Sequence, residues 1–417
     1  MGQSVDLPHD LPVDARLQSL TPVAGTILPR SYERAFGLQG CSLYPTKFLA
    51  ASSQAVDEHG GRRLRIALIV APFIAVPPAD YGGTELFVAH LAEGLKKEGV
   101  DVAVFANGES TVTTERRWLY EHSQWPIKVP EEAWLRELNH NSWAVRGASD
   151  CDLVHVQSPQ GLAFSRFINC PFVLTLHGPH VPAISEYYGY FPDARYVCIS
   201  NAQAKQESMP KMRTIHHGIN LDLYHLVERK KQYLSFIGRI APLKGTHLAI
   251  EVAQRTGIPL KIAGDVQPMY REYFEQKIRP HVDGKLVEYI GLADLAAKNE
   301  LLGNSLAMLF PIQWNEPFGL VMVEAMACGT PVLAMPGGSV PEIVKDGVSG
   351  YICRSVREMS KRALGLDLNP VMVRRYVEDN FSIEKMVKRY IALYDETLNE
   401  KRSGLQGPPS LQPALHG

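Results

Sequence analysis

Short apolar runs and helical apolar periodicities alternate along most of this chain. Bounded by polar or turn-forming residues, such runs are typical of strands buried in a parallel sheet. They are Arg65–Ala71, Val102–Phe105, Leu153–Val156, Phe172–Leu176, Tyr196–Ile199, Tyr233–Ile237, Leu260–Ala263, Val287–Ile290 and Leu306–Phe310. Helical spacing follows most of them, as at Leu86–Leu95 and Thr246–Thr256. The alternation predicts an α/β fold with doubly wound parallel sheets.

The length of 417 residues is sufficient for two domains of about 150–200 residues each. We predict a first domain over residues 62–217 and a second over 218–381, and we interpret the charged run Glu228–Lys231 as a solvated linker. The two ends of the chain fit neither domain. The flanking segments are an N-terminal extension of unknown structure over 1–61, an amphipathic helix over 382–402 and a tail over 403–417.

The most informative stretch is Glu316–Val332, EPFGLVMVEAMACGTPV, which follows the predicted strand Leu306–Phe310. Glu316 lies on the loop after that strand, and Glu324 lies eight positions later in the helix that follows. Two glutamates at this spacing are more often solvated surface residues than ligands. The flanking Pro-Phe-Gly and Cys-Gly-Thr-Pro sequences argue against that interpretation here.

The start of this helix offers backbone N–H groups that have no partner inside the helix. The donors are those of Phe318, Gly319, Leu320 and Val321. Such a helix N-terminus attracts phosphate or oxygen-rich ligands. A carboxylate on each side of the donors suits the hydroxyl groups of a sugar or ribose, and it disfavours a bare anion.

Three other loops carry candidate ligand-binding residues at the carboxyl ends of predicted strands, where open α/β sheets bind ligands. Gly82 and Gly83 precede a helix and permit close approach of a phosphate, although a plain tight turn is the commoner explanation of such a pair. His177 directly follows a strand and is either a site residue or a structural histidine. Arg239 and Lys244 together suit a diphosphate, whereas either residue alone would be interpreted as a surface cation.

Composition narrows the class of protein. Hydrophobic residues make up 45% of the chain and the net charge is −1, which argues against a partner such as nucleic acid. No apolar run reaches transmembrane length, and no signal peptide is visible. The six cysteines show neither paired nor zinc-type spacing, so we expect reduced thiols in a cytoplasmic protein.

Glu316, Glu324 and the segment Phe236–Gly245 resemble the E-x7-E signature and basic loop of retaining glycosyltransferases of family 4. The resemblance extends over roughly Leu64 to Tyr394 and is greatest to a bacterial subgroup that includes antibiotic-tailoring sugar transferases. It implies the GT-B architecture, in which two Rossmann-like domains face one another across a cleft. It also implies that the helix over 382–402 crosses back onto the first domain.

The resemblance also implies roles for individual residues. Those implied in catalysis are Glu316, His177, Arg239 and Lys244. Those implied in donor binding are Gly82, Gly83, Arg239, Lys244, Ile290, Glu316, Phe318, Gly319, Leu320, Val321 and Glu324. In this scheme Glu316 contacts the transferred sugar, Glu324 contacts the ribose, and the backbone near Ile290 meets the nucleotide base.

The implied reaction moves a sugar from a nucleotide-diphosphate sugar, with a UDP-sugar as first candidate, to an acceptor hydroxyl with retained configuration. The acceptor attacks from the front face, and the donor's own phosphate takes its proton. We expect no metal or other cofactor, because Arg239 and Lys244 supply positive charge and no Asp-x-Asp cluster lies near the motifs. A membrane-surface acceptor stays open, although no strongly basic amphipathic helix supports one.

Other functions remain to be distinguished at this stage. A sugar phosphorylase of the same architecture would release sugar phosphate only when phosphate is present. A nucleotide-sugar epimerase would lack the stretch that carries Glu316 and Glu324. A catalytically silent sugar-nucleotide-binding subunit would bind donor without releasing nucleotide, but the intact set of candidate residues argues against it.

Overall fold

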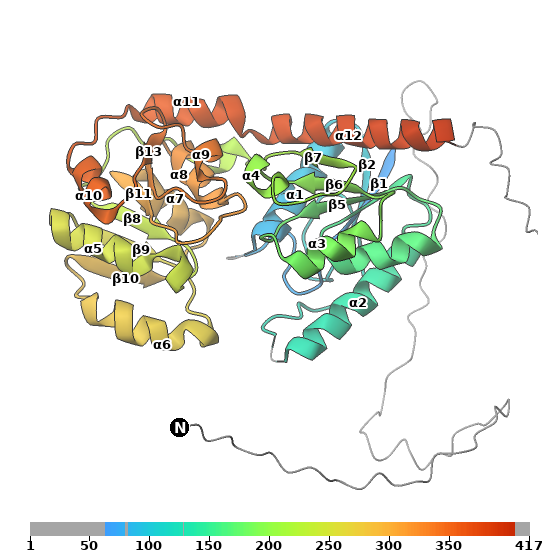
Figure 1. The fold of residues 1–417 in the computed structure, drawn as a ribbon, viewed down its shortest axis with the longest axis horizontal. Helices are drawn as coiled ribbons and strands as arrows, with labels where there is room; N and C mark the ends of the chain where they lie inside the picture. The colour runs from blue at the N-terminus through green and yellow to red at the C-terminus, as the bar shows by residue number, and fades with distance from the viewer. Residues whose placement is uncertain (1–62, 80–81, 128, 405–417) are drawn as a thin grey trace, which may run out of the picture. The chain divides into compact units, whose positions relative to one another are not determined.

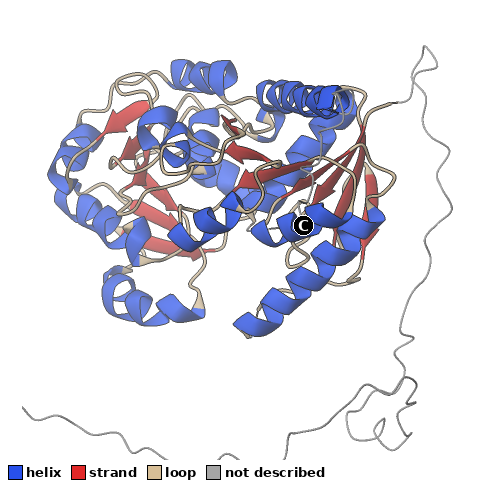
Figure 2. Cartoon of the chain, turned by 45° about the vertical axis from the view of Figure 1, so that its right-hand side comes forward, coloured by secondary structure: helices blue, strands red, loops and turns tan. Residues whose placement is uncertain are grey.

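A computed structural model describes residues 63–79, 82–127 and 129–404. The predicted extension over 1–61 and most of the predicted tail lie outside these residues. Two parallel sheets form the described part, with helices on both faces of each (Figures 1 and 2). We call the part around the first sheet the N-lobe and the part around the second the C-lobe. The doubly wound α/β class with two Rossmann-like domains is confirmed.

The N-lobe sheet has seven strands in the order β3-β2-β1-β4-β5-β6-β7. The strands are β1 Arg65–Ile69, β2 Asp101–Ala106, β3 Glu115–Trp118, β4 Leu153–Val156, β5 Phe172–Leu176, β6 Arg195–Cys198 and β7 Met212–Thr214. The helices are α1 Gly83–Lys97, α2 Pro130–Gly147, α3 Pro182–Gly189 and α4 Asn201–Ala204, with a 3₁₀ segment at Pro159–Phe167. The order reverses between β1 and β4, so ligands are expected at the carboxyl ends of these two strands.

Alternate residues of β1 point to opposite faces of the sheet and so divide the N-lobe core in two. Ile66 and Leu68 pack with α1, whereas Ala67 and Ile69 pack with α2. The two edge strands, β3 and β7, were not predicted. They read ERRW and MRT, and their side chains are exposed or half-buried, so no apolar run marks them.

The C-lobe sheet has six strands in the order β10-β9-β8-β11-β12-β13. The strands are β8 Leu234–Ile237, β9 Leu260–Ala263, β10 Val287–Gly291, β11 Ala307–Phe310, β12 Val332–Ala334 and β13 Gly350–Ile352. The helices are α5 Thr246–Thr256, α6 Arg271–Tyr273, α7 Leu295–Gly303, α8 Leu320–Ala327, α9 Val340–Ile343, α10 Val356–Leu364 and α11 Pro370–Asn380. This sheet reverses between β8 and β11, which places the loops after these strands side by side.

The last helix, α12 Ile383–Gly404, packs against α1 of the N-lobe (Figure 1). The contact is close because Gly94 has no side chain, and a Cβ there would collide with Val387. The buried Tyr394 hydroxyl lies 2.8 Å from Nδ1 of His155, beneath the N-lobe sheet. The chain therefore returns to its first lobe after completing the second, and α12 runs two residues past the predicted end at 402.

The charged run Glu228–Lys231 is not a solvated linker throughout, so that interpretation is wrong for Lys230. Its ammonium group donates to the carbonyl oxygens of Gly303 and Cys328 and to the Thr330 hydroxyl, at 2.8–3.0 Å. Burial lowers the pKa of Lys230 to about 8. Lys230 thus ties the segment between the lobes to the body of the C-lobe.

Candidate donor and acceptor site

The loops after β8 and β11 meet at the point where the C-lobe strand order reverses. Lys244, on the first loop, donates to Oε2 of Glu316, on the second, with a distance of 2.6 Å. The indole N–H of Trp314 donates to the same oxygen at 3.0 Å. The Lys244 ammonium group also lies 4.7 Å from the centre of the Trp314 ring. A buried carboxylate is therefore held by a cation and an aromatic donor.

The loop after β8 needs a glycine for this geometry. Gly245 adopts φ 73°, and a side chain there would collide with the carbonyl oxygen of Pro311. The close approach brings the Lys244 end of one loop against the other loop. Arg239, at the start of the same loop, is half-buried and makes a long contact of 3.5 Å with Gln267, and its Nε has no hydrogen-bond partner among the described residues. An unpaired guanidinium nitrogen is available to bind an anion.

Helix α8 begins at Leu320, with Gly319 in the left-handed conformation as its N-cap. The first described hydrogen bond of this turn joins Met322 N to Gly319 O at 2.9 Å. The N–H groups of Leu320 and Val321 precede that bond and so belong to the open end of the helix. Phe318, next to them, is buried in the C-lobe core.

Glu324 is buried in the second turn of α8. Its Oε1 accepts hydrogen bonds from the Tyr224 hydroxyl at 2.8 Å and from Lys298 Nζ at 3.2 Å, while its Oε2 has no partner among the described residues. Burial and the nearby carboxylate raise the pKa of Tyr224, so its hydroxyl stays a donor. No local signal marks Tyr224 and Lys298, since each is distant in sequence from Glu324.

The N-lobe presents the start of α1 to the start of α8. A Cβ added at Gly83 would lie 3.8 Å from Leu320 Cδ1, so the two helix ends approach each other across the lobes. Gly82 is the N-cap of α1, with φ 156°. The nearby Glu85 is buried, and its burial raises the pKa of its carboxyl to about 7.

His177 lies between the lobes in a group of rings. Its Nε2 is 2.9 Å from Oε1 of Gln157, and its ring stacks on that of His217 with centroids 5.5 Å apart. Phe87 of α1 and Phe318 of the C-lobe both pack against His217. Desolvation holds the pKa of His177 and of His217 well below the ordinary value, so both rings are neutral at pH 7. Sequence reasoning did not identify His217 as a site residue, because no local motif marks it.

Glu342 of α9 joins the two lobes directly. Its carboxylate accepts from the backbone N–H groups of Asn201 and Ala202, at 2.8 and 2.6 Å, at the start of α4. Nε2 of His216 lies 3.0 Å from the same carboxylate. These contacts fix the start of α4 relative to α9.

Ile290 is placed differently from the other candidate residues. It lies on the edge strand β10, which runs one residue past the predicted end to Gly291. Its side chain is 38% exposed, and β10 is two strands from β8 in the sheet. Ile290 is therefore not part of the Lys244–Glu316–Trp314 cluster.

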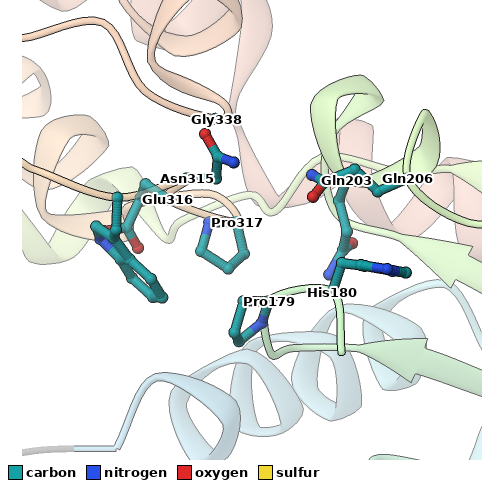
Figure 3. A pocket seen from close by; sticks show the side chains of 9 residues that line it. Pro179, His180, Gln203, Gln206, Asn315, Glu316, Pro317 and Gly338 are labelled. Atoms are coloured by element: carbon teal, nitrogen blue, oxygen red, sulfur yellow. The ribbon is translucent and has the colours of Figure 1, made fainter. Parts of the chain in front are cut away.

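A pocket opens between the lobes next to Glu316 (Figure 3). Pro179, His180, Gln203 and Gln206 line it from the N-lobe, and Trp314, Asn315, Glu316, Pro317 and Gly338 line it from the C-lobe. In the part of the chain that the structure describes, no group of three or more metal-ligating side chains is placed to hold a metal ion. Within the same residues, no helix has the length and apolarity needed to span a membrane.

Two doubly wound lobes whose helix starts converge define a protein of the GT-B architecture. Comparison with known proteins identifies the family. The model described as "Glycosyltransferase Family 4" matches residues 81–223, and that described as "Glycosyl transferases group 1" matches residues 225–366. Together these matches cover more than half of the chain, which belongs to the family 4 glycosyltransferases.

The similarity to an individual curated relative covers a smaller part of this chain than the two family models do. The "Putative glycosyltransferase YtcC" of Bacillus subtilis is 30% identical over 204 residues, which are 44% of this chain and 49% of that protein. The alignment thus spans about half the length of this relative.

Among the solved structures that match this chain, two illustrate the shared fold. AviGT4, "a glycosyltransferase involved in Avilamycin A biosynthesis", has a TM-score of 0.63 and 25% identity, covering 81% of this chain and 98% of that one. HepE of Anabaena, solved with UDP and glucose, has a TM-score of 0.65 and 16% identity, covering 80% of this chain and 100% of its own.

Proposed function

We propose that this protein transfers a sugar from a nucleotide-diphosphate sugar, a UDP-sugar, to an acceptor hydroxyl, with retention of configuration and without a metal ion. The observation that carries the proposal is the Lys244–Glu316 pair beside the open start of α8. A cation and backbone donors suit a diphosphate, and a buried carboxylate beside them suits sugar hydroxyls.

The donor occupies the C-lobe side of the site. Arg239, Lys244 and the N–H groups at the start of α8 bind the diphosphate, and Glu324 binds ribose through the oxygen that has no partner. Uridine as the base is supported by the fold neighbour HepE, whose structures contain UDP and UDP-glucose. Free thiols at Cys151, Cys170, Cys198, Cys328 and Cys353 support the proposed cytoplasmic setting.

The chemistry separates charge. The bond between the sugar's anomeric carbon and the diphosphate oxygen breaks, leaving negative charge on the diphosphate and positive charge on the sugar. Lys244 and Arg239 stabilise the former, and the Glu316 carboxylate stabilises the latter. The acceptor oxygen bonds to the anomeric carbon from the face that the diphosphate leaves, and its proton passes to a diphosphate oxygen. No carboxylate nucleophile is required, in contrast to retaining glycosidases.

Neutral His177 fits this scheme as a hydrogen-bonding group beside the sugar. Gln157 binds one ring nitrogen, and the stacked His217 fixes the plane of the ring. A neutral imidazole adds no positive charge near a sugar that is becoming electron-poor. The ring group thus orients the sugar without opposing the charge that develops on it.

Donor binding tests the proposal first. A thermal-shift screen of UDP-, GDP-, ADP- and dTDP-glucose should show stabilisation by the UDP-sugar, because a ligand that binds only the folded state raises Tm. Release of UDP in the presence of mixed acceptors, with an α-linked product seen by NMR, would complete the case. Binding without release in any acceptor mixture, or release only with inorganic phosphate, would contradict it.

A further inference from the structure

The carboxylate of Glu342, in the C-lobe, binds backbone N–H groups of the N-lobe. It accepts from Asn201 and Ala202, the first two residues of α4, at 2.8 and 2.6 Å. Glu342 lies on α9, and α4 and α9 are neighbours where the lobes meet (Figure 1). The ring of His216 lies 3.0 Å from the same carboxylate. The Glu342 side chain is 19% exposed, so these groups rather than water satisfy most of its hydrogen-bonding capacity.

On the N-lobe side, α4 is bonded to the strand end that carries His177. The side-chain amide of Gln203, on α4, donates to the carbonyl oxygens of Leu176 at 2.9 Å and Gly178 at 2.7 Å. These two residues flank His177 in the chain. Gln203 is buried, and its amide oxygen also accepts from the N–H group of Ile199 at 2.8 Å. The start of α4 and the backbone around His177 should therefore move together.

On the C-lobe side, α9 is bonded to the loop that carries Glu316. Ser339, the N-cap of α9, donates its N–H to the Glu316 carbonyl oxygen and its hydroxyl to that of Phe318, both at 2.9 Å. Gly338 adopts φ 55°, and a Cβ there would collide with the Glu316 backbone. The N–H group of Glu342 donates back to Ser339 O at 2.8 Å. Glu342 is thus joined to the Glu316 loop by one short turn.

The two chain segments that connect the lobes run side by side. The N–H group of Ile219 donates to Phe381 O at 2.9 Å, and that of Ile383 donates to Ile219 O at 3.1 Å. Gly218 permits this approach, since a Cβ there would collide with the Ser382 backbone. Two adjacent connections form one narrow hinge, so contacts elsewhere between the lobes decide the angle at which they meet.

We propose that Glu342 is a positioning residue for sugar transfer, which holds His177 and Glu316 at the separation that the reaction requires when the lobes are closed. It acts through Gln203 on the backbone around His177 and through Ser339 on the Glu316 loop. The inference rests on the proposed function, because it needs both residues beside the transferred sugar. Hydrogen bonds from N–H groups to a carboxylate depend on distance and direction, so the contact forms when the lobes close and breaks when they open.

Glu342→Ala and Glu342→Gln measure this role through UDP release from UDP-glucose, with water as the acceptor. In Glu342→Ala kcat should fall by about tenfold or more, because small displacements of reacting groups slow a reaction steeply. Glu342→Gln keeps one accepting oxygen and should retain more activity. The Kd of UDP should stay near that of wild type, since the proposed nucleotide contacts lie in the C-lobe. Glu358→Gln is the matched control, because Glu358 accepts from Arg354 N within the C-lobe and its loss should leave kcat unchanged.

Asn201→Pro removes one donor of the contact and leaves Glu342 intact. Asn201 is the first residue of α4 and follows Ser200 in extended conformation, a position at which proline is well tolerated. The value of kcat should fall as in Glu342→Gln. The double variant should lose less than the product of the two single losses, because both changes break the same contact. Losses that multiply would show that the two residues act independently and would overturn the positioning role.

Small-angle X-ray scattering distinguishes failure of this inference from failure of the proposed function. With UDP-glucose bound, the radius of gyration of Glu342→Ala should exceed that of wild type, and that of Glu358→Gln should equal it. An unchanged radius together with an unchanged kcat in Glu342→Ala would overturn the positioning role. Absence of UDP-glucose binding to the wild-type chain in calorimetry would instead contradict the proposed function, and the radii of the ligand-free proteins would still report on the lobe contact.

Discussion

Lys244 Nζ lies 2.6 Å from Glu316 Oε2, in a pair whose members are 72 residues apart in sequence. Both side chains are largely buried, so neither charge is fully compensated by water. The pair joins the group proposed to bind diphosphate to the group proposed to bind the sugar. In the proposed donor complex Lys244 exchanges the Glu316 carboxylate for the diphosphate, so a change in either residue should alter the role of the other.

Arg239→Ala and Lys244→Ala should each weaken UDP binding by about 1.5–3 kcal/mol, the usual loss for a hydrogen bond to a charged group. Lys244→Ala also leaves Glu316 buried without its cation, near the diphosphate. Calorimetry with UDP and with uridine measures both effects. Uridine affinity should be nearly unchanged, and equal losses for both ligands would place these residues elsewhere.

A double variant checks the pair itself. Glu316→Gln combined with Lys244→Ala should lose less UDP affinity than the sum of the single losses, by about 0.5–3 kcal/mol, because residues in one ion pair are not additive. Strict additivity would show that the ion pair does not influence donor binding.

Glu316 and Glu324 should differ in kinetic effect. Ribose does not change during transfer, so Glu324→Gln should mainly raise the donor KM. The transferred sugar becomes electron-poor, so Glu316→Gln should mainly lower kcat. Steady-state kinetics with calorimetry on UDP would decide between these patterns. If Glu316→Gln loses nucleotide affinity and Glu324→Gln loses only turnover, the donor lies in the opposite orientation.

Tyr224→Phe should raise the donor KM with little change in kcat, because it removes the 2.8 Å hydrogen bond that orients Glu324. The expected loss is about 1–3 kcal/mol, since the lost bond is to a charged, buried acceptor. A Tyr233→Phe variant is the matched control, because Tyr233 donates to a backbone carbonyl away from Glu324. An unchanged donor KM in Tyr224→Phe would contradict the proposed role of Glu324 in ribose binding.

Turnover should persist in EDTA, because Arg239, Lys244 and the start of α8 supply the positive charge that a metal ion would otherwise provide. The measurement is UDP release with EDTA and with added magnesium or manganese. Loss of turnover in EDTA that either metal restores would show that the enzyme needs a divalent cation.

His155 should contribute to the loss of stability in acid. Burial holds its pKa at about 3, below the value of about 6.5 in an unfolded chain. Between these values the unfolded state binds one more proton than the folded state, so the free energy of unfolding falls as pH falls. The slope due to His155 is about 1.4 kcal/mol per pH unit.

Urea unfolding of wild type and His155→Gln between pH 6.5 and 4 measures this contribution. In His155→Gln the free energy of unfolding should depend less steeply on pH, by about 1.4 kcal/mol per pH unit. His122→Gln, at an exposed site, should leave this pH dependence unchanged. Equal slopes in wild type and His155→Gln would show that His155 gains its proton without unfolding.

The local pattern of the sequence was sufficient for the alternating elements and for the motif around Glu316 and Glu324. The spacing of apolar residues that is typical of a strand or a helix can be recognised within a short stretch of sequence. A strand that is buried on both faces appears in the sequence as a continuous apolar run. The polar edge strands β3 and β7 leave no such runs, because only one side of each strand pairs and their side chains stay in contact with water. Their positions therefore came only from the folded chain.

The partners within the site depended on tertiary structure. Tyr224 and Lys298 reach Glu324 from other elements, and His217 stacks on His177 only because the lobes meet. The pairing of Lys244 with Glu316 follows from the reversal of strand order between β8 and β11, which the apolar runs do not encode. Sequence spacing thus determined which residue types were present, and packing between distant elements decided which of them meet.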